Sequence, residues 1–200
     1  MDHRSSVASV AERRWSWPTC HVEGFRQGEG VSVEGRSDDG TFHSGADEYI
    51  AALGREGITV EHMYAHDVPE RFPAYVEALN AYDFIILSDI GANSFLLPQE
   101  TWLHGRPSTN RLKNLADGVR GGGALMMAGG NLNFTGFPVR ANFARRTLAQ
   151  VLPVTMRDYD DRVEVPEGAV PTLDATDHPD GRAWQQEAPI LLGYNRVVAK

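Results

Sequence analysis

Two stretches in the middle of the chain are apolar at every position. Residues 84–87 read Phe-Ile-Ile-Leu, and residues 124–128 read Ala-Leu-Met-Met-Ala. A strand with apolar side chains at successive positions has both faces covered, which is typical of the inner strands of a parallel sheet. We therefore predict that these stretches are adjacent or near-adjacent central strands of such a sheet. Residues 58–61 alternate apolar and polar, which predicts a half-covered or edge strand.

Helical patterns separate these strands. A capping box of Ser44 with Asp47, followed by apolar residues on one helical face, predicts a helix that ends at Gly57. A second helix is predicted between the two apolar stretches, with Thr109 or Asn110 as its cap and the glycines 121–123 at its end. Its apolar residues have the i, i+3, i+4, i+7 spacing of one helical face: Leu112, Leu115, Ala116 and Val119.

Strands that alternate with helices in this way predict an α/β fold with a doubly wound, mostly parallel sheet. Residues 7–10 are the one upstream candidate for its first strand. From residue 154 onward, short alternating pieces lie between prolines and predict a β-rich extension. We expect a single domain, with an α/β core at about residues 1–152 and the extension at about 153–200. Whether the chain is a shortened form of a longer protein stays open.

Composition excludes several classes of protein. A formal charge of -8 repels a phosphate backbone, so nucleic acid is not an expected partner. No apolar stretch approaches the roughly 20 residues that cross a bilayer, and residues 1–14 lack the apolar segment of a secretory signal. Cys20 is the only cysteine, so neither an internal disulfide nor a zinc site of several thiolates is expected. These features favour a cytoplasmic protein without a metal or a cofactor.

The candidate site lies in the loops that follow the predicted strands. Ligands of open α/β sheets bind beyond the carboxyl ends of the strands, here at residues 12–21, 88–94 and 129–136. The candidate ligand-binding residues in the last two loops are Asp89, Asn93, Gly129, Gly130 and Asn131. Cys20 and His21, in the first loop, are a thiol beside an imidazole and the candidate catalytic pair, although adjacent side chains usually point apart.

Each of these residues also has a purely structural interpretation. Asn and Asp often serve turns by hydrogen bonding to their own backbone, and a glycine pair after a buried strand is often a tight turn. The charged residues 160–164 are interpreted as a solvated strand edge rather than a metal or substrate patch.

Several longer phrases of the chain resemble those of a known family. They are residues 81–93, 121–130, 133–136, 151–156, 159–166 and 192–195. These phrases occur in order from about residue 40 onward, and with them the chain resembles the putative glutamine amidotransferase-like cytoplasmic proteins of bacteria, relatives of the class I glutamine amidotransferases. The resemblance implies a flavodoxin-like, class I amidotransferase-like fold.

The resemblance also implies a strained G-x-C-x-G turn, whose thiolate attacks the side-chain amide of glutamine, and a later His-Glu pair that activates this thiolate. The corresponding residues 128–132 read Ala-Gly-Gly-Asn-Leu and include neither cysteine nor serine. Removal of a catalytic nucleophile lowers kcat by a factor on the order of 10⁶. The chain also ends at Lys200, before the family's later strands, so the His-Glu pair is not expected within it.

We therefore expect no glutaminase activity and a domain that binds a small molecule or serves in assembly. The alternative is an enzyme that acts on a polar small molecule, an amide or a carbohydrate, through altered chemistry on the same scaffold with Cys20 and His21. Whether the chain is catalytic stays open. The expected partners are a polar small molecule and further copies of the chain, with no nucleic acid and no membrane.

Overall fold

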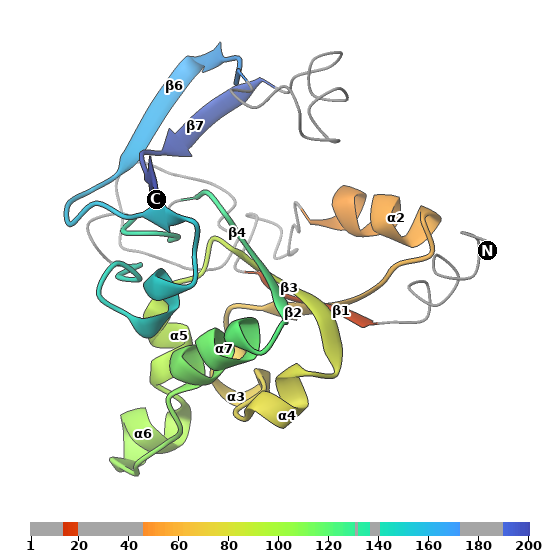
Figure 1. Cartoon of the computed structure of the whole chain (residues 1–200), viewed down its shortest axis with the longest axis vertical. Helices are drawn as coiled ribbons and strands as arrows, with labels where there is room; N and C mark the ends of the chain where they lie inside the picture. The colour runs from red at the N-terminus through yellow and green to blue at the C-terminus, as the bar shows by residue number, and fades with distance from the viewer. Residues whose placement is uncertain (1–13, 20–45, 131, 137–140, 173–189) are drawn as a thin grey trace, which may run out of the picture.

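Four strands form one parallel sheet in the computed structural model, which describes residues 14–19, 46–130, 132–136, 141–172 and 190–200. The strands are β1 (Arg14–Thr19), β2 (Thr59–Tyr64), β3 (Tyr82–Ser88) and β4 (Ala124–Ala128), and their order across the sheet is β2-β1-β3-β4 (Figure 1). All three strand pairs are parallel. The α/β class predicted from the sequence is thereby confirmed.

The two apolar stretches are neighbours, as predicted. Phe84 on β3 lies opposite Ala124 on β4, and this register continues to Ser88 and Ala128. β3 is an inner strand, between β1 and β4. β4, in contrast, has only β3 beside it among the described residues, and Met126 is 46% exposed, so the prediction of a central position was wrong for this strand. An apolar run does not by itself distinguish a strand covered on both faces from one with an open face.

The first strand lies later in the chain than the pattern suggested. β1 occupies residues 14–19 and pairs with both β2 and β3, so most of the loop predicted over residues 12–21 is a strand. Residues 7–10, the predicted strand, lie outside the described part of the chain. The missed signal is the Trp-Ser-Trp alternation of residues 15–17, because aromatic residues in alternate positions favour strands.

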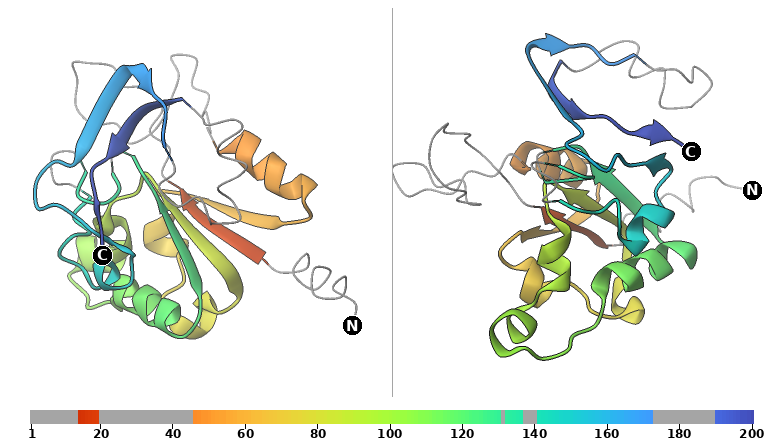
Figure 2. Two further views of the ribbon diagram at one scale, coloured as in Figure 1. Left: turned by 45° about the horizontal axis from the view of Figure 1, so that its top comes forward. Right: turned by 90° about the vertical axis from the view of Figure 1, so that its left-hand side faces the viewer.

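Helices cover the sheet from two sides, and the side chains of β3 explain why. Ile85 and Leu87 belong to the larger core, whereas Ile86 packs with residues of α2, so successive side chains point to opposite faces. Figure 1 and Figure 2 show α2 apart from the other helices. The helices are α2 (Asp47–Arg55), α3 (Val68–Arg71), α4 (Val76–Leu79), α5 (Ala92–Leu96), α6 (Gln99–His104) and α7 (Arg111–Arg120), with a short 3-10 helix η1 (Thr147–Gln150).

The predicted helix ends are only partly right. Asn110 caps α7, and its side-chain oxygen accepts from the amide of Lys113 at 3.0 Å. At α2 the N-cap residue is Ala46, with no side-chain hydrogen bond, and Ser44 of the predicted capping box lies outside the described residues. Gly57 follows α2 with φ 77°, in the left-handed region, as its predicted role in ending the helix requires.

The last part of the described chain is antiparallel. β5 (Val154–Thr155) pairs with β8 (Val198–Ala199), and β6 (Arg162–Ala169) pairs with β7 (Leu191–Asn195). Figure 1 and the right-hand view of Figure 2 show β6 and β7 as an arm that stands away from the helices. The arm begins next to the carboxyl end of β4, which positions it to cover the loop that follows that strand.

Candidate functional site

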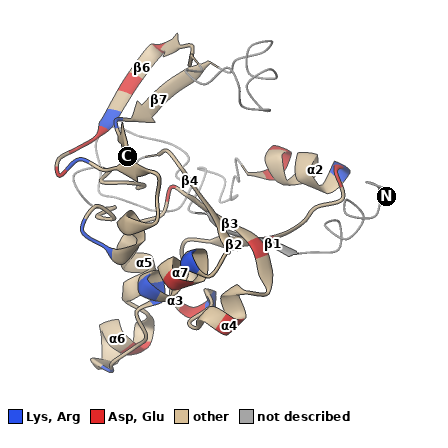
Figure 3. Cartoon of the chain, viewed as in Figure 1, with Lys and Arg blue, Asp and Glu red and all other residues tan. Residues whose placement is uncertain are grey.

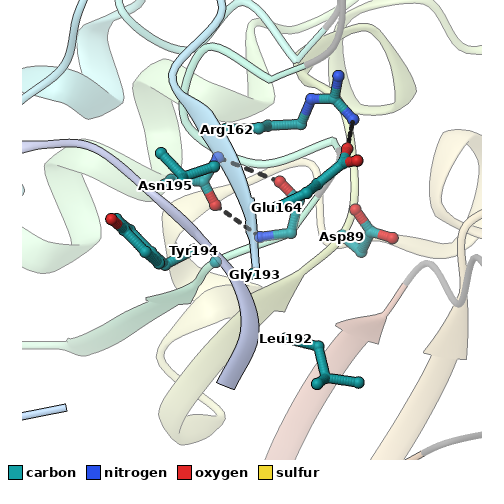
Figure 4. Close-up of a pocket in the computed structure, with 10 residues that line it drawn as sticks. Asp89, Arg162, Glu164, Leu192, Gly193, Tyr194 and Asn195 are labelled. Carbon is teal, nitrogen blue, oxygen red and sulfur yellow. Dashed lines mark hydrogen bonds and ion pairs between the residues drawn. The ribbon is translucent and has the colours of Figure 1, made fainter. Parts of the chain in front are cut away.

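A cavity of about 600 Å³ lies between the carboxyl edge of the sheet and the β6–β7 arm (Figure 4). Two kinds of residue line it, those that follow β3 and β4 and those of the arm. They are Asp89, Gly129, Gly130, Arg162, Val163, Glu164, Leu192, Gly193, Tyr194 and Asn195. The volume is within the usual range of small-molecule sites, roughly 300–1,000 Å³.

Two side chains tie the loops after β3 and β4 together. Asp89 has φ 47°, an uncommon conformation for a residue with a side chain, and its Oδ1 accepts from the amide of Leu132 at 2.6 Å. The side chain of Asn133 is fully buried: its Oδ1 accepts from the amide of Ile90 at 3.2 Å, and its Nδ2 donates to the carbonyl of Leu87 at 3.1 Å. Asn133 therefore has a structural role, but it bonds the backbone of the loop after β3 rather than its own turn.

Two further side chains join the loop after β4 to the arm. Asp161 is fully buried; its Oδ2 accepts from the amide of Thr135 at 3.0 Å, and its Oδ1 accepts from the amide of Gly136 at 3.1 Å. The same Oδ1 accepts from Nδ2 of Asn195 at 2.9 Å. Asn195 in turn accepts from the amide of Gly130 at 2.8 Å and donates to its carbonyl at 3.1 Å.

The glycine pair is required by close approach. A Cβ at Gly129 would lie 2.9 Å from Oδ1 of Asn195, and a Cβ at Gly130 would lie 2.8 Å from Oδ1 of Asp89. Both distances are shorter than van der Waals contact. The turn therefore fits between one side chain from the sheet and one from the arm only because it carries no side chains of its own.

Both signs of charge occur at the base of β6 (Figure 3). The guanidinium of Arg162 contacts Oδ1 of Asp160 at 3.1 Å and Oε1 of Glu164 at 3.0 Å. Hydrogen bonds from the Arg162 side chain hold the pKa of Asp160 below its ordinary value. Arg162, the only cation among the described residues that line the cavity, is therefore already paired with two carboxylates.

Three of the five predicted ligand-binding residues line this cavity: Asp89, Gly129 and Gly130. Asn93 does not line it, because the predicted loop ends at Gly91, the N-cap of α5. This helix buries Ala92 and Phe95, while Asn93 is exposed. Asn131, Cys20 and His21 lie outside the described residues.

The sequence pattern missed the contribution of the arm. Residues 160–164 were interpreted as a solvated edge, which suits the exposed Glu164 but is wrong for the buried Asp161. Asn195 lies in residues 192–195, one of the phrases that resemble the family, but the sequence indicated no role for its side chain. An aspartate that directly precedes a strand, among other charged residues, gives no local signal of burial, since its partners are more than 20 residues away in the sequence.

The sequence pattern of the family described as "putative glutamine amidotransferase" matches residues 9–200. The chain belongs to this family. No curated protein matches the chain.

Two solved structures of proteins from Salmonella typhimurium are similar to this chain. Cytoplasmic protein STM3548 from Salmonella typhimurium is 34% identical, with a TM-score of 0.79, over 93% of this chain and 74% of that one. Cytoplasmic protein STM1381 from Salmonella typhimurium LT2 is 37% identical, with a TM-score of 0.77, over 94% of this chain and 75% of that one.

Neither a metal cluster nor a membrane helix is found in the part of the chain that the structure describes. No three or more His, Cys, Asp or Glu side chains there come together in a way that could hold a metal ion. None of the helices there has the length and apolar character needed to cross a membrane.

Proposed function

We propose that the chain binds a polar small molecule in the cavity between the sheet and the arm and does not hydrolyse glutamine. The family's name suggests an attack on the side-chain amide of glutamine, which requires a nucleophile at the turn after β4. Residues 128–132 supply no thiol and no hydroxyl. The family fold is retained around this turn while the nucleophile is missing, which favours binding over glutaminase chemistry.

The observation that carries the proposal is the use of the turn's own amides. An oxyanion hole needs backbone N–H groups that point at the reacting carbonyl and are not otherwise engaged. Here the amide of Gly130 donates to Asn195, and the amide of Leu132 donates to Asp89. Side chains of the protein therefore occupy two backbone donors of this turn, in addition to the absence of a nucleophile.

The proposal also covers the finer classification of the fold. We regard the sheet as the inner part of a doubly wound, flavodoxin-like domain of the class I amidotransferase type, supported by its β2-β1-β3-β4 order and by helices on two sides. In that fold, ligands bind at the carboxyl ends of the strands, where Asp89, Gly129 and Gly130 lie. Asn131, Cys20 and His21 stay predicted members of the site, and one domain over residues 1–200 and a homo-oligomer stay predictions. A cytoplasmic location is proposed because both neighbours are described as cytoplasmic proteins.

The proposal is tested by offering glutamine to the purified full chain and measuring released ammonia. We expect no ammonia above a protein-free blank. A steady rate that disappears in Cys20→Ser would refute the proposal and make the chain's only cysteine a displaced nucleophile. Binding is tested in parallel by a thermal-shift screen, because a ligand at 100 times its Kd adds about 2.7 kcal/mol of apparent stability.

A further inference from the structure

We propose that the ligand of the cavity is an organic cation with N–H donors, a primary ammonium or guanidinium compound, held at the polar face of the β6–β7 arm. This inference rests on the binding function proposed above and names the class of its ligand. It depends on which face of the arm meets the turn after β4, which hydrogen-bonding groups there are already used within the protein, and which charge remains.

The arm directs a polar face at the turn. In the antiparallel register Arg162 lies opposite Asn195 and Glu164 lies opposite Gly193, so these residues share one face of the arm. Asn195 hydrogen bonds to Gly130, so this is the face that meets the turn. The positions between them are apolar and point to the opposite face. A ligand between the turn and the arm therefore meets polar groups of the arm.

The hydrogen-bond donors of this polar face are already used within the protein. The amide of Gly130 donates to Oδ1 of Asn195 at 2.8 Å. Nδ2 of Asn195 donates its two hydrogens to the carbonyl of Gly130 at 3.1 Å and to Oδ1 of Asp161 at 2.9 Å. The guanidinium of Arg162 donates to two carboxylates, at 3.1 and 3.0 Å. A ligand that needs donors from the protein, as an anion does, therefore finds few of them here.

Hydrogen-bond acceptors, in contrast, remain. Oε1 of Glu164 accepts from Arg162 at 3.0 Å (Figure 4), but a carboxylate has about four acceptor positions, and 70% of this side chain is exposed. The carbonyl of Gly130 and Oδ1 of Asn195 each accept one hydrogen bond and have a second lone pair. An ammonium group has only donors, and so has a guanidinium group. Either group therefore matches a surface that can mainly accept.

The charge of the lining has the same preference. Arg162 contacts the carboxylates of Asp160 and Glu164, so one positive and two negative charges leave a net charge of −1. Hydrogen bonds from Arg162 hold the pKa of Asp160 below its ordinary value, so this carboxyl is ionised at neutral pH. Asp89, which lines the cavity from the sheet side, makes the net charge −2. A cation is attracted to this lining and an anion is repelled, whereas a neutral ligand gains nothing from its charge.

The test is titration calorimetry of the full chain with five small probes. Putrescine, 1,4-butanediol and succinate share a four-carbon chain and differ in charge. Agmatine carries a guanidinium group, and choline is a cation without N–H donors. We expect putrescine and agmatine to bind, with affinities that fall as the salt concentration rises, and the other three probes to bind at least about tenfold more weakly.

Two variants locate the binding. Glu164→Gln keeps the shape of the side chain and removes its charge, so it should lower the affinity for putrescine about tenfold. Glu167→Gln is the matched control, because Glu167 is an exposed residue of the same strand that does not line the cavity. Its affinity for putrescine should stay within about twofold of that of the unchanged chain. Thermal melting without a probe checks that both variants keep the fold.

The outcomes separate this inference from the function on which it rests. If none of the five probes binds, both the binding function and the inference are overturned. If butanediol or succinate binds and neither putrescine nor agmatine does, the binding function stands and the inference is overturned. The inference also fails if choline binds as tightly as putrescine, or if Glu164→Gln weakens putrescine binding no more than Glu167→Gln does. Putrescine binding that weakens in Glu164→Gln but not in Glu167→Gln supports it.

Discussion

Asp161 is the side chain on which the attachment of the arm should depend most, and Asp161→Ala tests this directly. The carboxylate is fully buried and accepts from the amides of Thr135 and Gly136 and from Nδ2 of Asn195, at 2.9 to 3.1 Å. Alanine leaves the first two amides without this acceptor in a buried place. Each unsatisfied buried donor costs about 1–3 kcal/mol, so we expect Asp161→Ala to lower the free energy of unfolding by about 3–5 kcal/mol.

The matched variants separate the loss of acceptors from the loss of charge. Asp161→Asn keeps the size of the side chain and one acceptor oxygen, but it directs an amide donor at one of the backbone N–H groups. Its loss of unfolding free energy should therefore be about half that of Asp161→Ala. Asp158→Ala makes the same truncation at an exposed aspartate and should change stability by less than about 0.5 kcal/mol.

Urea unfolding gives the free energies, and hydrogen exchange gives the place of the effect. The exchange of the Thr135 and Gly136 amides should accelerate in Asp161→Ala, since both lose the carboxylate that protects them. If Asp161→Ala is as stable as Asp158→Ala and these two amides stay protected, the hydrogen bonds described here do not hold the arm to the sheet and the reasoning fails.

Two further predictions concern the turn and the core. Gly130→Ala should destabilise the protein by about 1–3 kcal/mol, because the new Cβ would lie 2.8 Å from Oδ1 of Asp89. Gly54→Ala in α2, with nothing within 4 Å of the new Cβ, should stabilise the protein by about 0.5–1 kcal/mol. Equal effects of the two variants in urea unfolding would contradict the crowding at the turn. Arg111→Met should lower the free energy of unfolding by about 1–3 kcal/mol, because the buried guanidinium donates to the carbonyls of Val68 and Pro69 at 3.0 and 2.5 Å. Arg106→Met, at an exposed position, should leave the free energy of unfolding nearly unchanged. If Arg111→Met also leaves it unchanged, this contact between α7 and α3 does not stabilise the protein.

The parts of the fold that were predictable are those with a local cause. The i, i+3, i+4, i+7 pattern and the Asn110 cap define α7, and the continuous apolar run defines β3, because helix and strand periodicity depend on residues a few positions apart. β1 was missed because it contains Pro18 and three of its six residues are polar, although pairing on both sides holds it in the sheet. Tertiary contacts outweighed the local signal in this strand.

The sheet side of the cavity was predictable for a topological reason. Parallel strands direct their carboxyl ends to one edge, so Asp89 and Gly130 could be expected to meet although 41 positions separate them in the numbering, and a direct approach of Asp89 to Gly130 is observed. The rule applies only to residues that follow sheet strands. It says nothing about an antiparallel arm that leaves the sheet and folds back over its edge.

The position of the β6–β7 arm could not be predicted from the sequence, and its contacts change how the turn after β4 is interpreted. Gly130 and Asn195 are 65 positions apart, and neither residue type signals the other. From the sequence, a glycine pair after β4 left two interpretations open, a tight turn or amides offered to an anion. Because the side-chain oxygen of Asn195 accepts from the amide of Gly130, the protein itself satisfies that donor. The groups of the lining that can meet a ligand then come mainly from the arm, with Arg162, Glu164 and Tyr194 among them. Ligand preference should therefore change with substitutions in β6 and β7 more than with substitutions in the turn after β4.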